Sequence, residues 1–180
     1  MNTWRNLPGK ALVSLISCHP FLRRRARRAA EVLEEHEREI FLGLNRYDLA
    51  HSLAVAARLR DDPLLVRAAL LHDAGKLPRE LSLWTRWMYT ALEVFFPSRL
   101  KELCREVEKE ACGDGVLERM ESLPPGWKRG LFVQVHHGEI AGELLRRKGS
   151  EETLVRLVEG HQGEPGDERA RRLRSLDDRL

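Results

Sequence analysis

The chain has 180 residues, of which 42% are hydrophobic and 33% are charged, and this balance excludes an intrinsically disordered protein. The length predicts one domain that buries about 70% of the surface of its unfolded chain. A net charge of +3 and a pI near 8.9 are too mild to indicate a stable nucleic-acid partner. No segment reaches the roughly 18 uncharged apolar residues of a membrane span, so no transmembrane segment is expected.

The N-terminal segment and the cysteines indicate a cytoplasmic protein. The apolar stretch Ala11–Cys18 is short and runs into Arg23-Arg24-Arg25, which favours a helix of the mature protein over a signal peptide. Three cysteines, Cys18, Cys104 and Cys112, form no Cys-x-x-Cys pair and suit a reducing compartment.

Residues 20–42 are predicted as one helix with a basic start and a Glu-rich middle. We expect several i,i+4 pairs between its Arg and Glu residues, Arg27 with Glu31 among them. A solvated helix face is the favoured interpretation of these charges. The alternative is an anion-binding patch for a phosphorylated ligand or nucleic acid.

Two helices should follow and pack against each other. Asn45 or Asp48 is suited to cap a helix that runs to about Arg60. After the break at Asp61-Asp62-Pro63, residues 64–72 are apolar almost all round, which predicts a central, buried helix. Because the connection is short, the two helices should be antiparallel neighbours, which would bring His51 and His72 together.

Residues 77–127 are the least regular part of the chain. A helix over Leu81–Phe96 carries many aromatic residues and should end at Pro97, with a charged helix from Arg99 to about Ala111. The aromatic stripe is most often a core surface. A contact with a second copy, a partner or a membrane surface is the alternative.

The C-terminal part places further polar residues on apolar helix faces. A helix from about Leu131 contains His136 and His137 and should end at Gly149, and Ser150 should cap the next helix. In that next helix His161 continues the apolar stripe. In the last helix Ala170, Leu173, Asp177 and Leu180 share one face, whereas Asp178 falls off it. The whole pattern predicts an all-α helical bundle.

These helices each contribute a histidine or an aspartate, and together they indicate a metal site in the core. A buried polar group is costly unless it is paired or coordinates a metal. His72 and Asp73 directly follow the buried helix, and Gly75 and Lys76 come next. Imidazole and carboxylate ligands without a thiolate favour Fe, Mn, Ni, Zn or Mg over a thiolate-bound structural metal. Bundles build metal sites from separate helices in this way.

In this order the residues resemble the HD-domain superfamily of metal-dependent phosphohydrolases. Residues 48–56 are similar to its opening His motif, and Leu70-Leu71-His72-Asp73-Ala74-Gly75-Lys76 matches its central His-Asp motif. Residues 137–145 are close to a further family segment, which selects His137 over His136. Residues 157–162 and 173–178 resemble the later His motif and the closing Asp motif. The chain departs from the family pattern at Gln162, where members often have a second histidine, and at Leu176, where Ala is usual.

The resemblance implies a division of the chain into a helical extension at residues 1–44, packed on the core, and an HD domain at residues 45–180. A helical insertion would occupy about residues 77–130.

It also implies a metal site and an activity. His51, His72, Asp73 and Asp177 would hold one metal, and His137 and His161, with Asp73 bridging, would complete a dinuclear site. The expected activity is hydrolysis of a nucleotide or other phosphate ester by metal-activated water, with monoesters, diesters and pyrophosphates left open. The alternative is a regulatory protein that binds metal and nucleotide with little turnover.

Three basic residues have expected roles around this site. Lys76 would bind a substrate phosphate, unless it is only a cation at a helix C-terminus. Arg46 is a weaker candidate for a phosphate contact. His136 would support the metal ligands from behind or lie at the surface.

Overall fold

The computed structural model describes residues 7–162 and 167–179, and every regular element in these ranges is helical. The predicted all-α fold is therefore confirmed for the described part of the chain. The elements are α1 (Leu7–Cys18), α2 (Leu22–Ala29), the 3₁₀ turn η2 (Ala30–Val32), α3 (Glu35–Gly43), α4 (Arg46–Ala56), α5 (Pro63–Leu71), α6 (Leu83–Phe95), α7 (Pro97–Glu110), α8 (Val116–Ser122), α9 (Trp127–Arg147), α10 (Glu152–Gly160) and α11 (Glu168–Asp177). None of these helices combines the length and apolar character needed to cross a bilayer.

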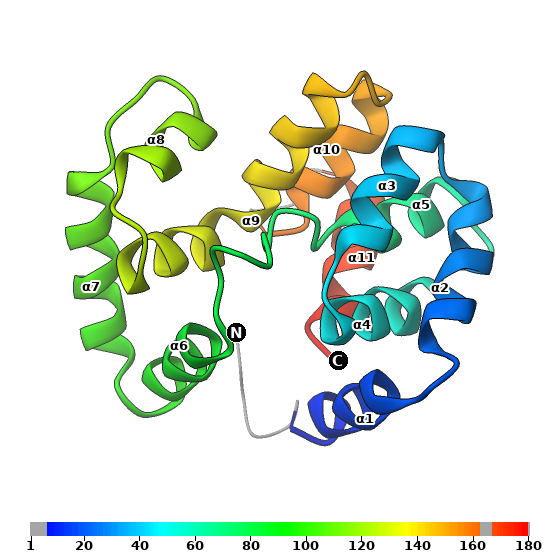
Figure 1. The fold of residues 1–180 in the computed structure, drawn as a ribbon, viewed down its shortest axis with the longest axis horizontal. Coiled ribbons are helices and arrows are strands. Elements are labelled where there is room, and N and C mark those ends of the chain that lie inside the picture. The colour runs from blue at the N-terminus through cyan, green and yellow to red at the C-terminus, as the bar shows by residue number, and fades with distance from the viewer. Residues whose placement is uncertain (1–6, 163–166, 180) are drawn as a thin grey trace.

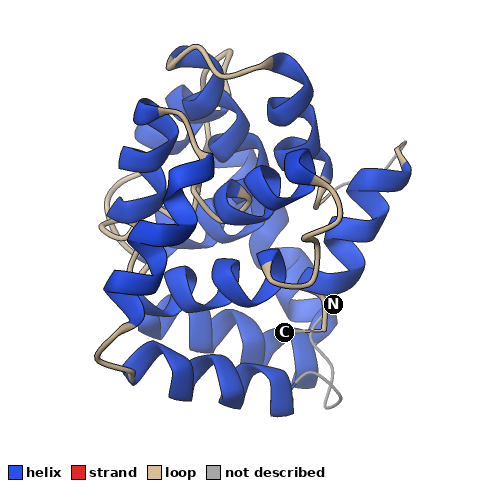
Figure 2. Cartoon of the chain, turned by 90° about the vertical axis from the view of Figure 1, so that its right-hand side faces the viewer, coloured by secondary structure: helices blue, strands red, loops and turns tan. Residues whose placement is uncertain are grey.

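The helices form two groups that share the long helix α9 (Figure 1). One group contains α1 to α5, α10 and α11, and the other contains α6, α7 and α8. Each group has its own cluster of buried apolar side chains. Helix α9 contributes to both, with Leu131 and Ile140 in the second cluster and Ala141 and Leu145 in the first. Figure 2 shows the helices stacked and joined by short loops.

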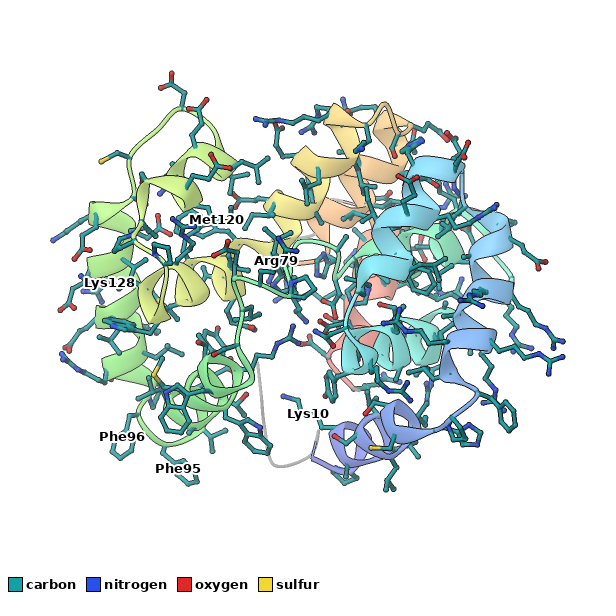
Figure 3. All side chains as sticks on the ribbon, viewed as in Figure 1. Lys10, Arg79, Phe95, Phe96, Met120 and Lys128 are labelled. Atoms are coloured by element: carbon teal, nitrogen blue, oxygen red, sulfur yellow. The ribbon has the colours of Figure 1, made fainter. Side chains whose placement is uncertain are left out.

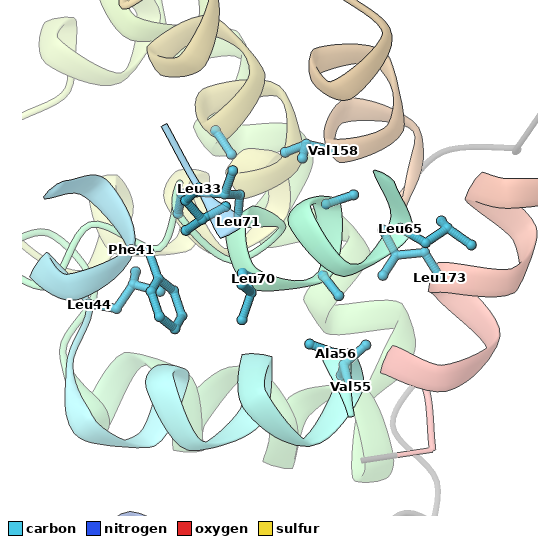
Figure 4. Close-up of a cluster of buried hydrophobic side chains, with 14 of the residues drawn as sticks. Leu33, Phe41, Leu44, Val55, Ala56, Leu65, Leu70, Leu71, Val158 and Leu173 are labelled. Atoms are coloured by element: carbon cyan, nitrogen blue, oxygen red, sulfur yellow. The ribbon is translucent and has the colours of Figure 1, made fainter. Parts of the chain in front are cut away.

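Helix α5 lies at the centre of the first group, as its sequence predicts. Leu65 and residues 68–71 are buried on it, and it packs against α3, α4, α10 and α11. Figure 4 shows Leu65 directed toward Leu173 of α11 and Leu70 toward the side where α3 places Phe41. Asp62 caps the helix by accepting from the backbone N–H groups of Leu64 and Leu65.

The prediction of one helix over residues 20–42 is wrong. The chain is extended at Leu33 and Glu34, which separates α2 and η2 from α3. Glu37 accepts from the backbone N–H of Glu34, which favours a new helix start there. The break also allows Leu33 to enter the core. Among the described residues, the α2 arginines form no ion pair with Glu31, Glu34 or Glu35, and Arg67 pairs with Glu34 and Glu37.

Some element boundaries also differ from the predictions. Pro97 is the first residue of α7, a position in which proline is favoured because its missing N–H has no partner to lose. Gly149 ends α9 as predicted, with a positive φ of 87° and the hydrogen bonds of a Schellman motif. Ser150 does not cap α10, because its hydroxyl bonds to His36 at 2.9 Å. Leu180, which was predicted on the face of the last helix, lies outside the described residues.

The prediction that the aromatic residues of α6 form core is wrong for most of them. Trp84, Trp87, Phe95 and Phe96 are all more than half exposed. Tyr89 packs against the second apolar cluster together with Leu92. The helix is therefore apolar on its inner face and also on its outer face.

Candidate metal centre

A tight turn after α5 carries His72, Asp73 and Lys76. It continues from the helix through backbone hydrogen bonds such as Ala74 N–H to Leu71 O and Lys76 N–H to Asp73 O. The turn lies directly on the backbone of α9, where a Cβ at Gly75 would come within 1.9 Å of the His137 carbonyl oxygen. Only glycine allows this approach. The contact sets the turn that carries Asp73 beside the segment of α9 that carries His137.

The structure brings six of the predicted ligands together from five helices. His51 comes from α4, His137 from α9, and the ends of α5, α10 and α11 supply the other four, which are His72, Asp73, His161 and Asp177. Their rings form a chain, with centroid distances of 5.3 Å for His51–His72, 5.1 Å for His72–His161 and 5.3 Å for His137–His161.

The two carboxylates lie within this chain of rings. Asp177 Oδ1 is 2.7 Å from His51 Nε2 and 3.4 Å from His72 Nε2. Asp73 Oδ1 is 3.4 Å from His72 Nε2 and 3.5 Å from His137 Nε2. Asp177 has a side chain that is a quarter exposed, and the other five residues are buried.

Within this cluster, two sets of three ligand atoms are close enough to hold an ion. One set belongs to His51, His72 and Asp177, and the other to His72, Asp73 and His161, with all atoms of each set within 4.8 Å of one another. Asp73 Oδ2 and the Nε2 atoms of His72 and His161 are buried without a hydrogen-bond partner among the described residues. Buried polar groups of this kind need an explanation, and a bound cation would supply one.

The tautomers of two histidines are suited to metal binding. The Nδ1 atoms of His72 and His161 face the backbone carbonyls of Ala69 and Val158. A carbonyl can only accept, so Nδ1 carries a proton, and in the neutral imidazole Nε2 is the atom that offers a lone pair. This is the arrangement in which a backbone partner orients a metal ligand.

His137 has two competing neighbours at Nδ1. The carbonyl of Gln134 lies 2.9 Å away and requires a proton on Nδ1. The side-chain nitrogen of Gln162 lies 2.8 Å away and would donate to an unprotonated Nδ1. Gln162 is held in this orientation because its Oε1 accepts from the Gly138 N–H at 2.7 Å. The surroundings of His72 and His161 fix the tautomer with the proton on Nδ1. The surroundings of His137 do not fix its tautomer.

Charge is concentrated in the cluster. Burial alone would lower the pKa of His72, but the charges of Asp73 and Asp177 outweigh it and raise that pKa to about 9. Burial also favours neutral forms of the carboxyl groups, yet nearby His72 holds the pKa of both Asp73 and Asp177 well below its ordinary value. Burial and the charge of His72 lower the pKa of His161 to about 4. The site therefore combines two anionic carboxylates with one cationic and one neutral imidazole.

Lys76 belongs to this group, with Nζ 2.6 Å from Asp73 Oδ1. Burial would lower its pKa, but Asp73, Asp48 and Asp177 together raise it, so the ammonium stays charged. Arg46 is placed elsewhere, because its guanidinium donates to the backbone carbonyls of Ser17 at the end of α1 and of His19 just after it.

His136 turns away from the cluster. It stacks on Phe132 and pairs with Glu108 of α7 and with Glu139.

A buried ion pair beside the cluster was not predicted. Arg86 of α6 binds Asp48 of α4 through two contacts of 2.6 and 2.7 Å, and Asp48 is fully buried. Asn45 caps α4 by accepting from the Asp48 N–H, which decides between the two predicted caps. Tyr47 lies near the same charges, and burial is the main reason that its pKa is raised. Arg86 and Asp48 are far apart in the sequence, so no local sequence pattern predicts their contact.

Comparisons with known proteins identify no relative. No family model, no curated protein and no solved structure matches the chain.

Proposed function

We propose that the chain is a metal-dependent phosphohydrolase of the HD-domain type, acting on a nucleotide or other phosphate ester. The observation that carries this proposal is the convergence of six imidazole and carboxylate side chains from five helices, with buried ligand atoms left without partners. Imidazole and carboxylate ligands suit Fe, Mn, Ni or Zn, and Mg to a lesser degree.

The geometry favours a single bound ion over two. Both candidate ligand sets use His72, and its Nδ1 is engaged with Ala69 O, so only Nε2 is free. One nitrogen lone pair cannot bind two ions. A second ion would therefore need His137 in its ligand tautomer, together with Asp73 and His161.

An ion bound here would supply Lewis acidity, which activates water and polarises a phosphoryl group. Lys76 supplies the fixed positive charge that a phosphate oxygen would contact, at the edge of the ligand cluster. Asp73 orients both Lys76 and the neighbouring imidazoles. With an ion held by the cluster, Lys76 would stabilise the extra negative charge that develops on the phosphoryl group as the bond to the leaving oxygen breaks.

The burial of the cluster favours a second candidate function. A metal site that is closed on all sides is typical of a structural or regulatory role. In that case the protein would bind metal and nucleotide but hydrolyse little, and His72 and Asp73 would matter for binding and stability only.

The experiment is metal analysis combined with turnover. Purified protein is loaded separately with Mn²⁺, Fe²⁺, Ni²⁺, Zn²⁺ and Mg²⁺ and assayed against nucleotides, phosphodiesters and pyrophosphates. We expect turnover that His72→Ala and Asp73→Ala abolish together with the bound metal. Asp178→Asn is the matched control, because Asp178 is exposed next to Asp177 and should leave both readouts unchanged.

Other outcomes would contradict parts of the proposal. Turnover that survives both alanine variants would exclude this site as the active site. Stoichiometric metal and nucleotide binding without turnover would establish the regulatory alternative. A stoichiometry of one ion, unchanged in His137→Ala, would exclude a dinuclear centre.

A further inference from the structure

Charge is distributed very unevenly along the chain. Seven of the 31 Lys and Arg residues, and none of the 28 Asp and Glu residues, lie within the first 30 positions. The remaining 150 residues therefore carry a net charge of −4 although the whole chain carries +3. Such asymmetry indicates a contact with a polyanion or an anionic surface.

The basic residues of α2 are exposed and available. Leu22 and Ala26 bury the inner face of this helix, so its arginines cover the outer face. Arg23 donates to the backbone carbonyl of Leu42. The other four have no ion-pair partner among the described residues; they are Arg24, Arg25, Arg27 and Arg28.

Large apolar side chains are exposed next to this helix. Leu15 of α1 is 73% exposed, and Leu12 of α1 and Phe21 at the start of α2 are about half exposed. On α6, Trp84, Trp87 and Phe95 are exposed at helical spacings of three and eight residues and so share one outer face.

Helices α1 and α6 both lie at the lower edge of the molecule in the view of Figure 1, and α2 follows α1 at the right-hand side. Lys10 of α1 lies in the electrostatic range of Glu93 of α6, and Figure 3 shows Lys10 between the two helices. Phe95 and Phe96 extend away from the body at the same edge. Glu93, the one carboxylate of α6, lies half a turn round the helix from Trp84, away from the aromatic face. The exposed faces of α1, α2 and α6 therefore combine tryptophan, phenylalanine, leucine and arginine without an acidic residue.

We infer that this edge binds the surface of a membrane containing anionic lipids. Tryptophan prefers the boundary between water and hydrocarbon, and basic residues are attracted to anionic headgroups. The exposed leucines favour a lipid over a nucleic acid, because aliphatic side chains neither stack on bases nor bind phosphate. The inference is independent of the proposed hydrolase activity.

The test is sedimentation with vesicles of phosphatidylcholine, either alone or mixed with phosphatidylglycerol. We expect binding only to the mixed vesicles, weakened by added salt. Replacing Arg24, Arg25 and Arg28 by glutamine should weaken binding on the order of a hundredfold, since each arginine contributes about fivefold near an anionic surface. The matched control replaces three exposed arginines that lie outside α1, α2 and α6 by glutamine: Arg105, Arg171 and Arg179.

The apolar part has its own test. Trp84→Ser with Trp87→Ser should also weaken vesicle binding, whereas Trp127→Ser on α9 should not. Circular dichroism of each variant should match the wild type, because all these side chains are at the surface. Equal vesicle binding by the arginine variant and its control would overturn the inference. So would concentration-dependent dimerisation lost in the tryptophan variant, or preferential binding of an oligonucleotide that competes with the vesicles.

Discussion

Replacing Gly75 by alanine tests the close contact between the backbone of α9 and the turn that carries His72 and Asp73. The new Cβ would lie 1.9 Å from the carbonyl oxygen of His137 and 2.8 Å from the amide nitrogen of Ala141. Both are backbone atoms of a buried helix segment, so neither can move aside as a flexible side chain would. Overpacking usually costs about 1–3 kcal/mol, and here two backbone segments must separate, so we expect a loss of about 3 kcal/mol or more. For a chain of this size the melting temperature would fall by roughly 6–12 °C.

Gly43→Ala is the matched control for this substitution. Gly43 is the last residue of α3, and a Cβ there would meet nothing within 4 Å. Because alanine is the better helix former, stability should be unchanged or rise by up to about 1 kcal/mol. Urea unfolding followed by circular dichroism measures both variants, and metal content reports the site. If Gly75→Ala unfolds at the same urea concentration as Gly43→Ala, the close contact that positions Asp73 beside His137 does not exist.

Three further predictions concern the charges around the site. Metal binding should release a proton from His72 at about pH 8, because its pKa of about 9 keeps the imidazole protonated until an ion displaces the proton. The affinity for the metal should therefore rise with pH up to about 9. Calorimetry in buffers of different ionisation enthalpy that detects no proton release would refute this prediction. Arg86→Leu should destabilise the protein by about 3–5 kcal/mol because it leaves Asp48 buried and unpaired, and Asp48→Leu in the same chain should recover much of the loss in urea unfolding. Lys76→Met should bind metal at least as tightly, since it removes a cation beside Asp73, but should lower kcat/KM by about a hundredfold, and equal loss of metal and activity would show that Lys76 is only structural.

The central helix and the inward placement of His161 and Asp177 were predictable because each depends on local periodicity. The helix over residues 64–72 is apolar almost all round, and α5 occupies the centre of the first group of helices. His161 and Asp177 continue apolar stripes, and a polar residue on such a stripe must point inward, which is where the structure places both.

The surface of α6 could not be predicted in this way. This helix is apolar on two faces, and periodicity does not say which face is covered. Tyr89 packs inward while Trp84 and Trp87 face outward, so the choice depends on how α7 and α9 pack against the helix, which its own periodicity does not specify. The pairing of Asp48 with Arg86 could not be predicted either, because it depends on how α6 is placed against α4.

The number of ions that the cluster could hold depends on Gln162 as well as on the candidate ligands themselves. The Gly138 N–H follows the kink of α9 at His136, and Gln162 satisfies it, which turns the side-chain nitrogen of Gln162 toward His137. If that nitrogen donates, the proton of His137 resides on Nε2, and the neutral imidazole has no lone pair facing Asp73. If Nδ1 instead donates to Gln134 O, Nε2 is free to bind a second ion. His72 and His161 have no such alternative, so their ligand form is fixed by the fold, whereas His137 becomes a ligand only at the expense of the hydrogen bond from Gln162.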